Sequence, residues 1–154
     1  MAPGSPERIS HEYVRHGTKS LLAAFVVHKG TLFGKCYDRH RHQKFIDFLN
    51  EIDSIYLKEE FHIIVDNFAT YKHQEVKKWL KKKDGRIKFH FTSTHASWLN
   101  QIELLLNIFS RKILKRGIFN SKEELVKSIM NFIQEYNKEA RSFKWTYKGE
   151  PLKV

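Results

Sequence analysis

The sequence predicts an α/β fold in which a mixed sheet is covered by helices. Two observations support this prediction. A pattern typical of an antiparallel hairpin comes first, and apolar strand patterns then alternate with amphipathic helix patterns, as in chains that build parallel strands through crossover helices. The 154 residues, 41% of them hydrophobic, have the size and composition of a single domain with a substantial core.

The first part of the chain predicts a lead segment, a hairpin and a helix. Residues 1–17 are polar and have no clear period, so we expect an irregular lead. Residues 20–28 are apolar and residues 31–37 alternate, which predicts two antiparallel strands with Gly30 in the turn. A helix is then predicted from Arg41, with an apolar stripe made by Phe45, Phe48, Leu49, Ile52 and Tyr56.

The second part alternates strands and helices around Asp66. Residues 61–65 are apolar and stop at this acidic residue, which predicts a buried strand with a carboxylate at its end. The remaining elements are a helix over 73–83, a strand over 87–91, a long helix from an N-cap at Ser97 to Gly117, and a last helix capped by Asn120 or Ser121.

Composition points to a soluble protein that binds polyanions. Lys and Arg number 28 against 17 Asp and Glu, a net charge of +11, and such a field attracts nucleic acid. No apolar run approaches the roughly 20 residues that span a bilayer, so we expect no membrane association and a cytoplasmic location. Cys36 is the single cysteine, which excludes an internal disulfide and a cysteine-based zinc cluster.

Asp66 and Glu103 are the candidate site residues. Asp66 ends a strand at the carboxyl edge of the sheet, where open α/β folds bind their ligands. Glu103 lies early in the helix that leaves the same edge, on the border of its apolar stripe. If the two carboxylates lie within about 8 Å, they can share divalent metal ions about 4 Å apart. The alternative is that Asp66 caps the following turn and Glu103 is a solvated helix residue.

Several motifs resemble the DDE transposases of mariner-like bacterial insertion sequences. They are Val65-Asp66-Asn67, Tyr71-Lys72-His73, Phe89-His90-Phe91-Thr92, Ser97-Trp98-Leu99-Asn100-Gln101-Ile102-Glu103, residues 11–18, residues 39–42 and residues 143–146.

This resemblance implies a ribonuclease H-like fold in which three acidic residues hold two Mg²⁺ ions, with Mn²⁺ as an alternative. Asp66 would be the second acidic residue and Glu103 the third, while Asn67, His95 and Asn100 could line the site. The partners implied are transposon ends and target DNA. The protein would then be cytoplasmic, and it would associate with the bacterial nucleoid when bound to DNA.

The chain also departs from this family. The first catalytic Asp and its strand, and the helix-turn-helix domains before it, have no counterpart here, so we expect residues 1–154 to be one catalytic-core domain truncated at its amino end. The chain alone would then be inactive and would need an upstream transposase product, a fused frame or full-length transposase as its partner. The alternative is a non-catalytic remnant that binds DNA or the transposase.

Basic residues beside the candidate site predict contacts to DNA phosphates. The lysines between 77 and 83 are expected to point mostly outward, and a second basic stretch follows Glu103. For each cluster, a merely solvated face is the alternative. The DNA-binding candidates are Lys77, Lys78, Lys81, Arg111 and Lys115.

Overall fold

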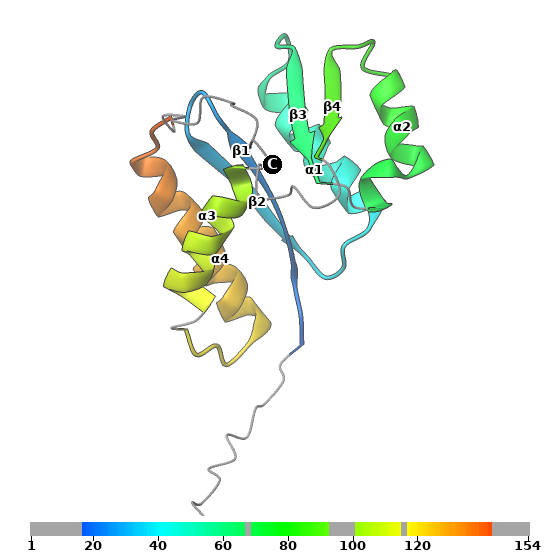
Figure 1. Cartoon of the computed structure of the whole chain (residues 1–154). Helices are drawn as coiled ribbons and strands as arrows, with labels where there is room; N and C mark the ends of the chain where they lie inside the picture. The colour runs from blue at the N-terminus through cyan, green and yellow to red at the C-terminus, as the bar shows by residue number, and fades with distance from the viewer. Residues whose placement is uncertain (1–16, 67–68, 93–100, 115–116, 143–154) are drawn as a thin grey trace, which may run out of the picture.

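The structure is a computed structural model that describes residues 17–66, 69–92, 101–114 and 117–142 (Figure 1). It is an α/β fold of four strands and four α-helices in these residues. The order is β1 (Ser20–Val26), β2 (Thr31–Tyr37), α1 (His42–Ile55), β3 (Phe61–Val65), α2 (Gln74–Lys81), β4 (Ile87–Phe91), α3 (Gln101–Phe109) and α4 (Lys122–Lys138).

The hairpin forms as predicted. β1 and β2 are antiparallel, with Ser20 opposite Tyr37 and Val26 opposite Thr31. The Val26 carbonyl accepts the Gly30 amide at 2.7 Å, and Gly30 has a φ of 70°, which a glycine adopts without strain. The turn residue that the sequence identified therefore has the conformation that this turn requires.

Two of the predicted helices, α2 and α4, begin with side-chain caps, whereas α1 has none and the predicted N-cap Ser97 lies outside the described residues. The His73 side chain accepts the Glu75 amide at the start of α2. At α4 the N-cap is Ser121, whose hydroxyl accepts the Glu124 amide at 3.1 Å, while the Glu124 carboxylate accepts the Asn120 amide at 2.8 Å. This reciprocal pair resolves the choice between Asn120 and Ser121 in favour of Ser121.

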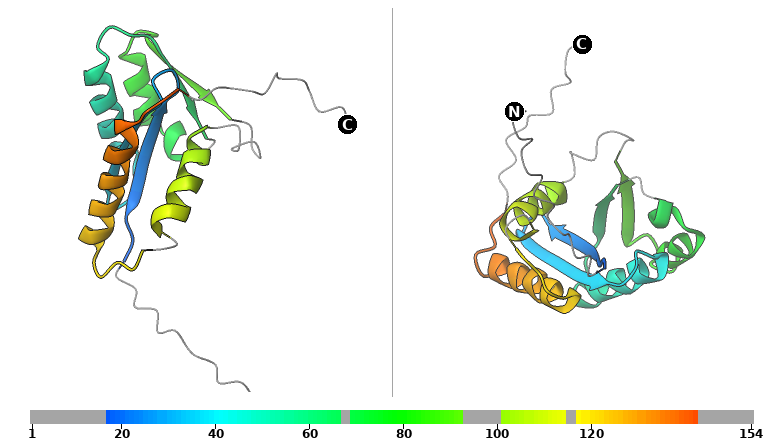
Figure 2. Two further views of the ribbon diagram at one scale, coloured as in Figure 1. Left: turned by 90° about the vertical axis from the view of Figure 1, so that its left-hand side faces the viewer. Right: turned by 90° about the horizontal axis from the view of Figure 1, so that it is seen from below.

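The strands form two separate pairs, where the sequence predicted one mixed sheet. β3 and β4 are parallel, with Phe61 opposite Ile87 and Val65 opposite Phe91. Within the described residues no ladder joins this pair to the β1–β2 hairpin. Figures 1 and 2 show β1 and β3 as the two strands that face each other. The antiparallel and the parallel pairing that a mixed sheet combines are both present. Among the described residues, however, no ladder joins the edge of β1 to the edge of β3.

Two apolar layers lie on opposite faces of the hairpin. Leu22 packs with α1, α2, β3 and β4, so α1 bridges the two strand pairs through Phe45 and Phe48. The alternate residues of the hairpin, including Leu32, pack with α3 and α4. The alternation along the strands thus divides the core into two layers, as expected for a sheet buried on both faces.

Helix α4 covers β2 closely and satisfies its outer edge. A Cβ at Gly34 would collide with the Ile133 side chain, so glycine permits this close approach. The Asn137 side chain accepts the Leu32 amide and donates to the Leu32 carbonyl, each at 2.8 Å. The side chain therefore replaces the ladder that a further strand would supply.

Two short irregular helical segments were not predicted. A 3-10 turn, η1 (Ala69–Lys72), precedes α2, and a π-helical turn, η3 (Ser110–Leu114), follows α3. The Gly117 amide bonds to the Ile113 carbonyl at 2.9 Å, near the predicted end of this helix. None of the helices in the described ranges combines the length and apolar character needed to cross a membrane.

Candidate functional site

Asp66 lies directly after β3, where the parallel strands end. The Thr92 amide donates to the Val65 carbonyl at 2.9 Å, so the chain leaves β3 and β4 at the same edge. Asp66 is half-buried, and its Oδ1 atom is fully buried without a hydrogen-bond partner among the described residues. Such an orphan oxygen is costly in a folded protein, and a carboxylate in this state is suited to binding a cation.

Tyr71 stands close enough to Asp66 to sense its charge. Burial, and secondarily the negative charge of Asp66, raise the pKa of Tyr71 to about 12. The ring of Tyr71 also packs on Phe45, with centroids 4.5 Å apart. The phenol therefore stays protonated at physiological pH and gives Asp66 a neutral, largely apolar neighbour.

Glu103 lies in the first turn of α3 and is half-buried, as its border position predicted. Leu105 and Phe109 are buried on the same helix and fix its packing in the second apolar layer. Gln101, two residues before Glu103, has a fully buried Oε1 atom without a partner among the described residues. Sequence reasoning did not select Gln101, although it belongs to the motif that contains Glu103.

The start of α3, which carries Glu103, and the ends of β3 and β4, where Asp66 follows, lie on the same side of the molecule. In Figures 1 and 2, α3 begins near the level at which β3 and β4 end, with β1 between them. The separation of about 8 Å expected for Asp66 and Glu103 stays a prediction. Four further candidates, Asn67, His95, Asn100 and Lys115, lie outside the described residues.

The candidate side chains have the ligand atoms that a hard divalent cation prefers, but they are too few to form a complete site. Two carboxylates and an amide provide oxygen donors, the ligands that Mg²⁺ and Mn²⁺ prefer. Within the described ranges, no group of three or more His, Cys, Asp or Glu side chains converges on one point. The described part of the chain thus contains two candidate carboxylates and no complete set of metal ligands.

The basic candidates separate into two surfaces. Lys77, Lys78 and Lys81 are exposed on α2, where they line a hollow of about 530 Å³ together with Lys72 and Gln74. Lys78 is paired with Glu75 at 2.9 Å. Arg111 is exposed in η3, and Figures 1 and 2 show α2 and the end of α3 on opposite sides of the molecule.

A further basic hollow lies where β2 meets α1. Its volume is about 380 Å³, and four cationic residues contribute to its wall. Lys19 is paired with Asp38 at 2.5 Å. Sequence reasoning grouped only residues 39–42 of this region; the missed members, Lys19 and Lys44, come from different elements. The hollow is lined by Lys19, Cys36, Tyr37, Asp38, Arg39, Arg41 and Lys44.

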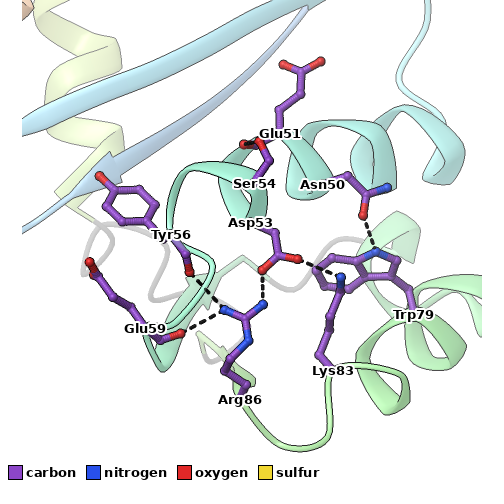
Figure 3. A network of polar contacts seen from close by, with 9 residues as sticks. All are labelled: Asn50, Glu51, Asp53, Ser54, Tyr56, Glu59, Trp79, Lys83 and Arg86. Atoms are coloured by element: carbon purple, nitrogen blue, oxygen red, sulfur yellow. Dashed lines mark hydrogen bonds and ion pairs between the residues drawn. The ribbon is translucent and has the colours of Figure 1, made fainter.

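One lysine expected to face solvent is instead part of a buried polar network. Lys83 donates to Asp53 at 2.7 Å, and Arg86 donates to the other carboxylate oxygen of Asp53 (Figure 3). Asp53 is only 8% exposed. Burial alone would raise the pKa of Asp53, but the hydrogen bonds from Lys83 and Arg86 outweigh burial and hold this pKa below its ordinary value. The lysines of this stretch were predicted to point mostly outward, and Lys83, which lies after the end of α2, is the half-buried exception.

Comparison with known proteins gives one match over most of the chain. A family described as DDE superfamily endonuclease matches residues 1–126. A comparison with curated proteins finds no match. The matched range contains β1 to α3, and with them both Asp66 and Glu103.

Proposed function

We propose, from the premise that this chain belongs to the DDE superfamily endonucleases, that it is the catalytic-core part of a transposase. Its reaction would be metal-dependent cleavage and strand transfer of DNA during transposition of an insertion sequence. The fold would be ribonuclease H-like, with β1, β2, β3 and β4 as parts of one sheet. The observation that carries the proposal is the Oδ1 atom of Asp66, which is buried at the carboxyl edge of the parallel strands and has no hydrogen-bond partner among the described residues.

Asp66 and Glu103 would act as metal ligands, and Mg²⁺ or Mn²⁺ would be the ion. When bound, the ions supply an activated nucleophile and stabilise the leaving oxygen of the phosphodiester. Asp66 is held by the end of β3, and its neighbour Tyr71 stays protonated at neutral pH, so it adds no second negative charge beside the carboxylate. The Oε1 atom of Gln101 could contact a bound cation beside Glu103, and its amide NH₂ group could donate a hydrogen bond to a phosphate oxygen. Asn67, His95 and Asn100 remain proposed site-lining residues.

Among the described residues the edges of β1 and β3 that face each other have no ladder partner, which supports the further proposal that another strand completes the sheet. Such a strand, inserted between them, would join both pairs into one mixed sheet over the apolar layer that α1 already shares. We propose that it comes from an upstream transposase product or full-length transposase and carries the third carboxylate. The 154-residue chain alone would then neither nick nor join transposon ends.

The activity test compares the chain alone with the chain supplied with an upstream transposase segment, fused or in trans. End-containing DNA is incubated with Mg²⁺ or Mn²⁺, and nicked and joined products are measured. We expect products only with the added segment. Asp66→Asn or Glu103→Gln should lower the rate by at least about 10³-fold, since each removes a charged metal ligand.

The outcomes separate the proposals. Cleavage by the chain alone that requires Asp66 would reject the need for another strand. Cleavage that is indifferent to both substitutions would reject the assignment of these carboxylates. Tight DNA binding without cleavage in either preparation would favour the alternative, a non-catalytic remnant that binds DNA or the transposase.

The positive charge of the chain motivates a separate proposal for DNA binding. We propose that Lys77, Lys78 and Lys81 contact DNA phosphates along α2, and that Arg111 and Lys115 do so beyond Glu103. Changing the three α2 lysines to Gln should lower the slope of log affinity against log salt by about two to three, because each phosphate contact releases close to one counterion.

The control for the α2 variant changes three exposed lysines elsewhere to Gln, namely Lys58, Lys127 and Lys138. This control has the same net charge as the α2 variant. Equal salt slopes for the two variants would show that total charge, and not the α2 surface, determines DNA affinity. A double variant of Arg111 and Lys115 tests the second surface in the same titration.

A further inference from the structure

Two histidines meet on the exposed face of the β3–β4 pair. His62 on β3 and His90 on β4 both face solvent, and their rings are nearly parallel with centroids 5.0 Å apart. The Nδ1 atom of His62 lies 2.8 Å from the Nε2 atom of His90. The parallel register sets Ile64 opposite His90, so the two rings are diagonal neighbours across the ladder.

Glu60 fixes the orientation of the first imidazole. Its Oε1 atom lies 3.3 Å from the other ring nitrogen of His62, Nε2. In the tautomer whose Nε2–H donates a hydrogen bond to this carboxylate, the Nδ1 atom of His62 carries a lone pair that faces His90. The same Oε1 atom is paired with Lys88 at 2.5 Å, which offsets the positive charge of that lysine next to the histidines.

This arrangement leads us to propose a transition-metal site that bridges β3 and β4, with His62 Nδ1 and His90 Nε2 as its protein ligands. The ion would be Zn²⁺ or a similar imidazole-binding metal, and Glu60 would orient His62 from behind. A carboxylate bonded to the far nitrogen of a ligating histidine is a common support in metal sites. Because no third side chain among the described residues joins the pair, water completes the coordination.

Metal binding requires the pair to open and both rings to turn. Two nitrogens bound to one tetrahedral zinc ion lie about 3.3 Å apart, which follows from bond lengths of about 2.0 to 2.1 Å. The nitrogens therefore separate by about 0.5 Å, and each ring turns so that the two nitrogens, which now point at each other, converge on the ion. Both side chains are exposed, which leaves them room for this movement. The proton that His90 Nε2 shares with His62 moves to Nδ1 of His90, a tautomer change that solvent permits.

The ligand type separates this site from the carboxylate site at the end of the strands. Imidazole nitrogens favour Zn²⁺, Ni²⁺ and Cu²⁺, while carboxylates favour Mg²⁺ and Mn²⁺. An ion held by both strands would add a cross-link to an isolated parallel pair, a pairing that proteins seldom leave uncovered. Zinc should therefore raise the thermal stability of the chain, and an equal excess of magnesium should not.

The test is calorimetric titration of the metal-stripped 154-residue chain with Zn²⁺ in a buffer that contains Mg²⁺. We expect His62→Gln and His90→Gln each to weaken Zn²⁺ binding at least about tenfold, and Glu60→Gln to weaken it up to about tenfold. Circular dichroism without metal establishes that each variant is folded. Imidazole proton shifts on Zn²⁺ addition provide a second readout at the two rings.

The matched control is His42→Gln. His42 stacks face to face on His73, with centroids 3.5 Å apart and planes 8° apart, and His73 Nδ1 already accepts the Glu75 amide. Zinc affinity should be unchanged in this variant. Parent-like affinity in both His62→Gln and His90→Gln would overturn the proposal, as would binding lost in Asp66→Asn but kept in the two histidine variants.

Discussion

Asp53 at the end of α1 and Asp66 at the end of β3 belong to the same half of the molecule, but their carboxylates have opposite surroundings. Both oxygens of Asp53 accept hydrogen bonds, one from Lys83 and one from Arg86. Asp66 has a buried oxygen without a partner among the described residues. A satisfied buried carboxylate stabilises a fold, whereas an unsatisfied one reduces stability and is retained where it binds something.

The same contrast separates two strand edges. Asn137 satisfies the outer edge of β2 through two hydrogen bonds to Leu32, while the edge of β1 that faces β3 is without a ladder partner in the described residues. One edge is closed by the chain itself. The other has the hydrogen-bonding groups that a further strand requires.

The largest effect should come from replacing the two aspartates in turn. Asp53→Asn leaves Lys83 and Arg86 without their counter-charge and should lower the free energy of unfolding by about 2 kcal/mol. This is less than the roughly 3–5 kcal/mol of a fully buried pair, because Lys83 and Arg86 keep 23% and 26% of their side-chain surface exposed. Asp66→Asn should leave stability unchanged or raise it by up to about 1 kcal/mol.

Urea unfolding of the parent and the two variants measures this difference. The Asn side chain is nearly isosteric with Asp at both positions, so each variant serves as the control for the other. An equal loss of stability in both variants would show that Asp66 is a structural carboxylate like Asp53. The contrast between the two sites would then have no functional meaning.

A smaller effect is expected at the closed strand edge. Asn137→Ala removes two hydrogen bonds to the Leu32 backbone and should cost about 1–2 kcal/mol. It should also increase association at high protein concentration, because β2 then presents a second unpaired edge. Gln134→Ala, an exposed change on the same helix, is the control in sedimentation and unfolding experiments. Equal behaviour of the two variants would mean that Asn137 does not protect this edge.

The smallest effect is the contribution of Asp53 to acid stability. Its pKa is held below the ordinary value of 3.8, so ionised Asp53 stabilises the fold fully above that pH. This contribution is lost as the pH falls through the lowered pKa. The stability difference between the parent and Asp53→Asn should therefore narrow between about pH 4 and pH 2. A difference that stays constant over this range would show that the Asp53 charge is not what stabilises the parent.

Local features of the sequence predicted most elements and several side-chain environments. The helix pattern placed Glu103 on the border of its stripe, and the structure finds it half-buried. The glycine in the hairpin and the serine before α4 were predicted from turn and cap chemistry, and both are confirmed. These features depend on residues within about four positions of one another, so they can be predicted from the local sequence.

Features that join distant residues were not predictable in this way. Asp53 meets Lys83 and Arg86 across about 30 positions, so no periodicity reveals the network. The separation of the strands into two pairs depends on ladders between elements, which a strand pattern does not specify. Gln101 was missed because an uncharged glutamine in a helix does not stand out as a site residue. Its position in the motif that contains Glu103 was the signal that could have identified it. The distance between Asp66 and Glu103 stays a prediction for the same reason.

The two glycine turns of the chain also differ in a way that matters for engineering. A Cβ at Gly30 would collide with the backbone of Arg141, so the hairpin turn is clamped by the segment after α4 and should not accept an inserted tag. At Gly85, which follows Asp84 between α2 and β4, no atom lies within 4 Å of the same position. An affinity epitope placed between Asp84 and Gly85 would thus extend from the chain without meeting either apolar layer, but it would interrupt the hydrogen bond from the Arg86 amide to the Lys83 carbonyl beside the Asp53 network.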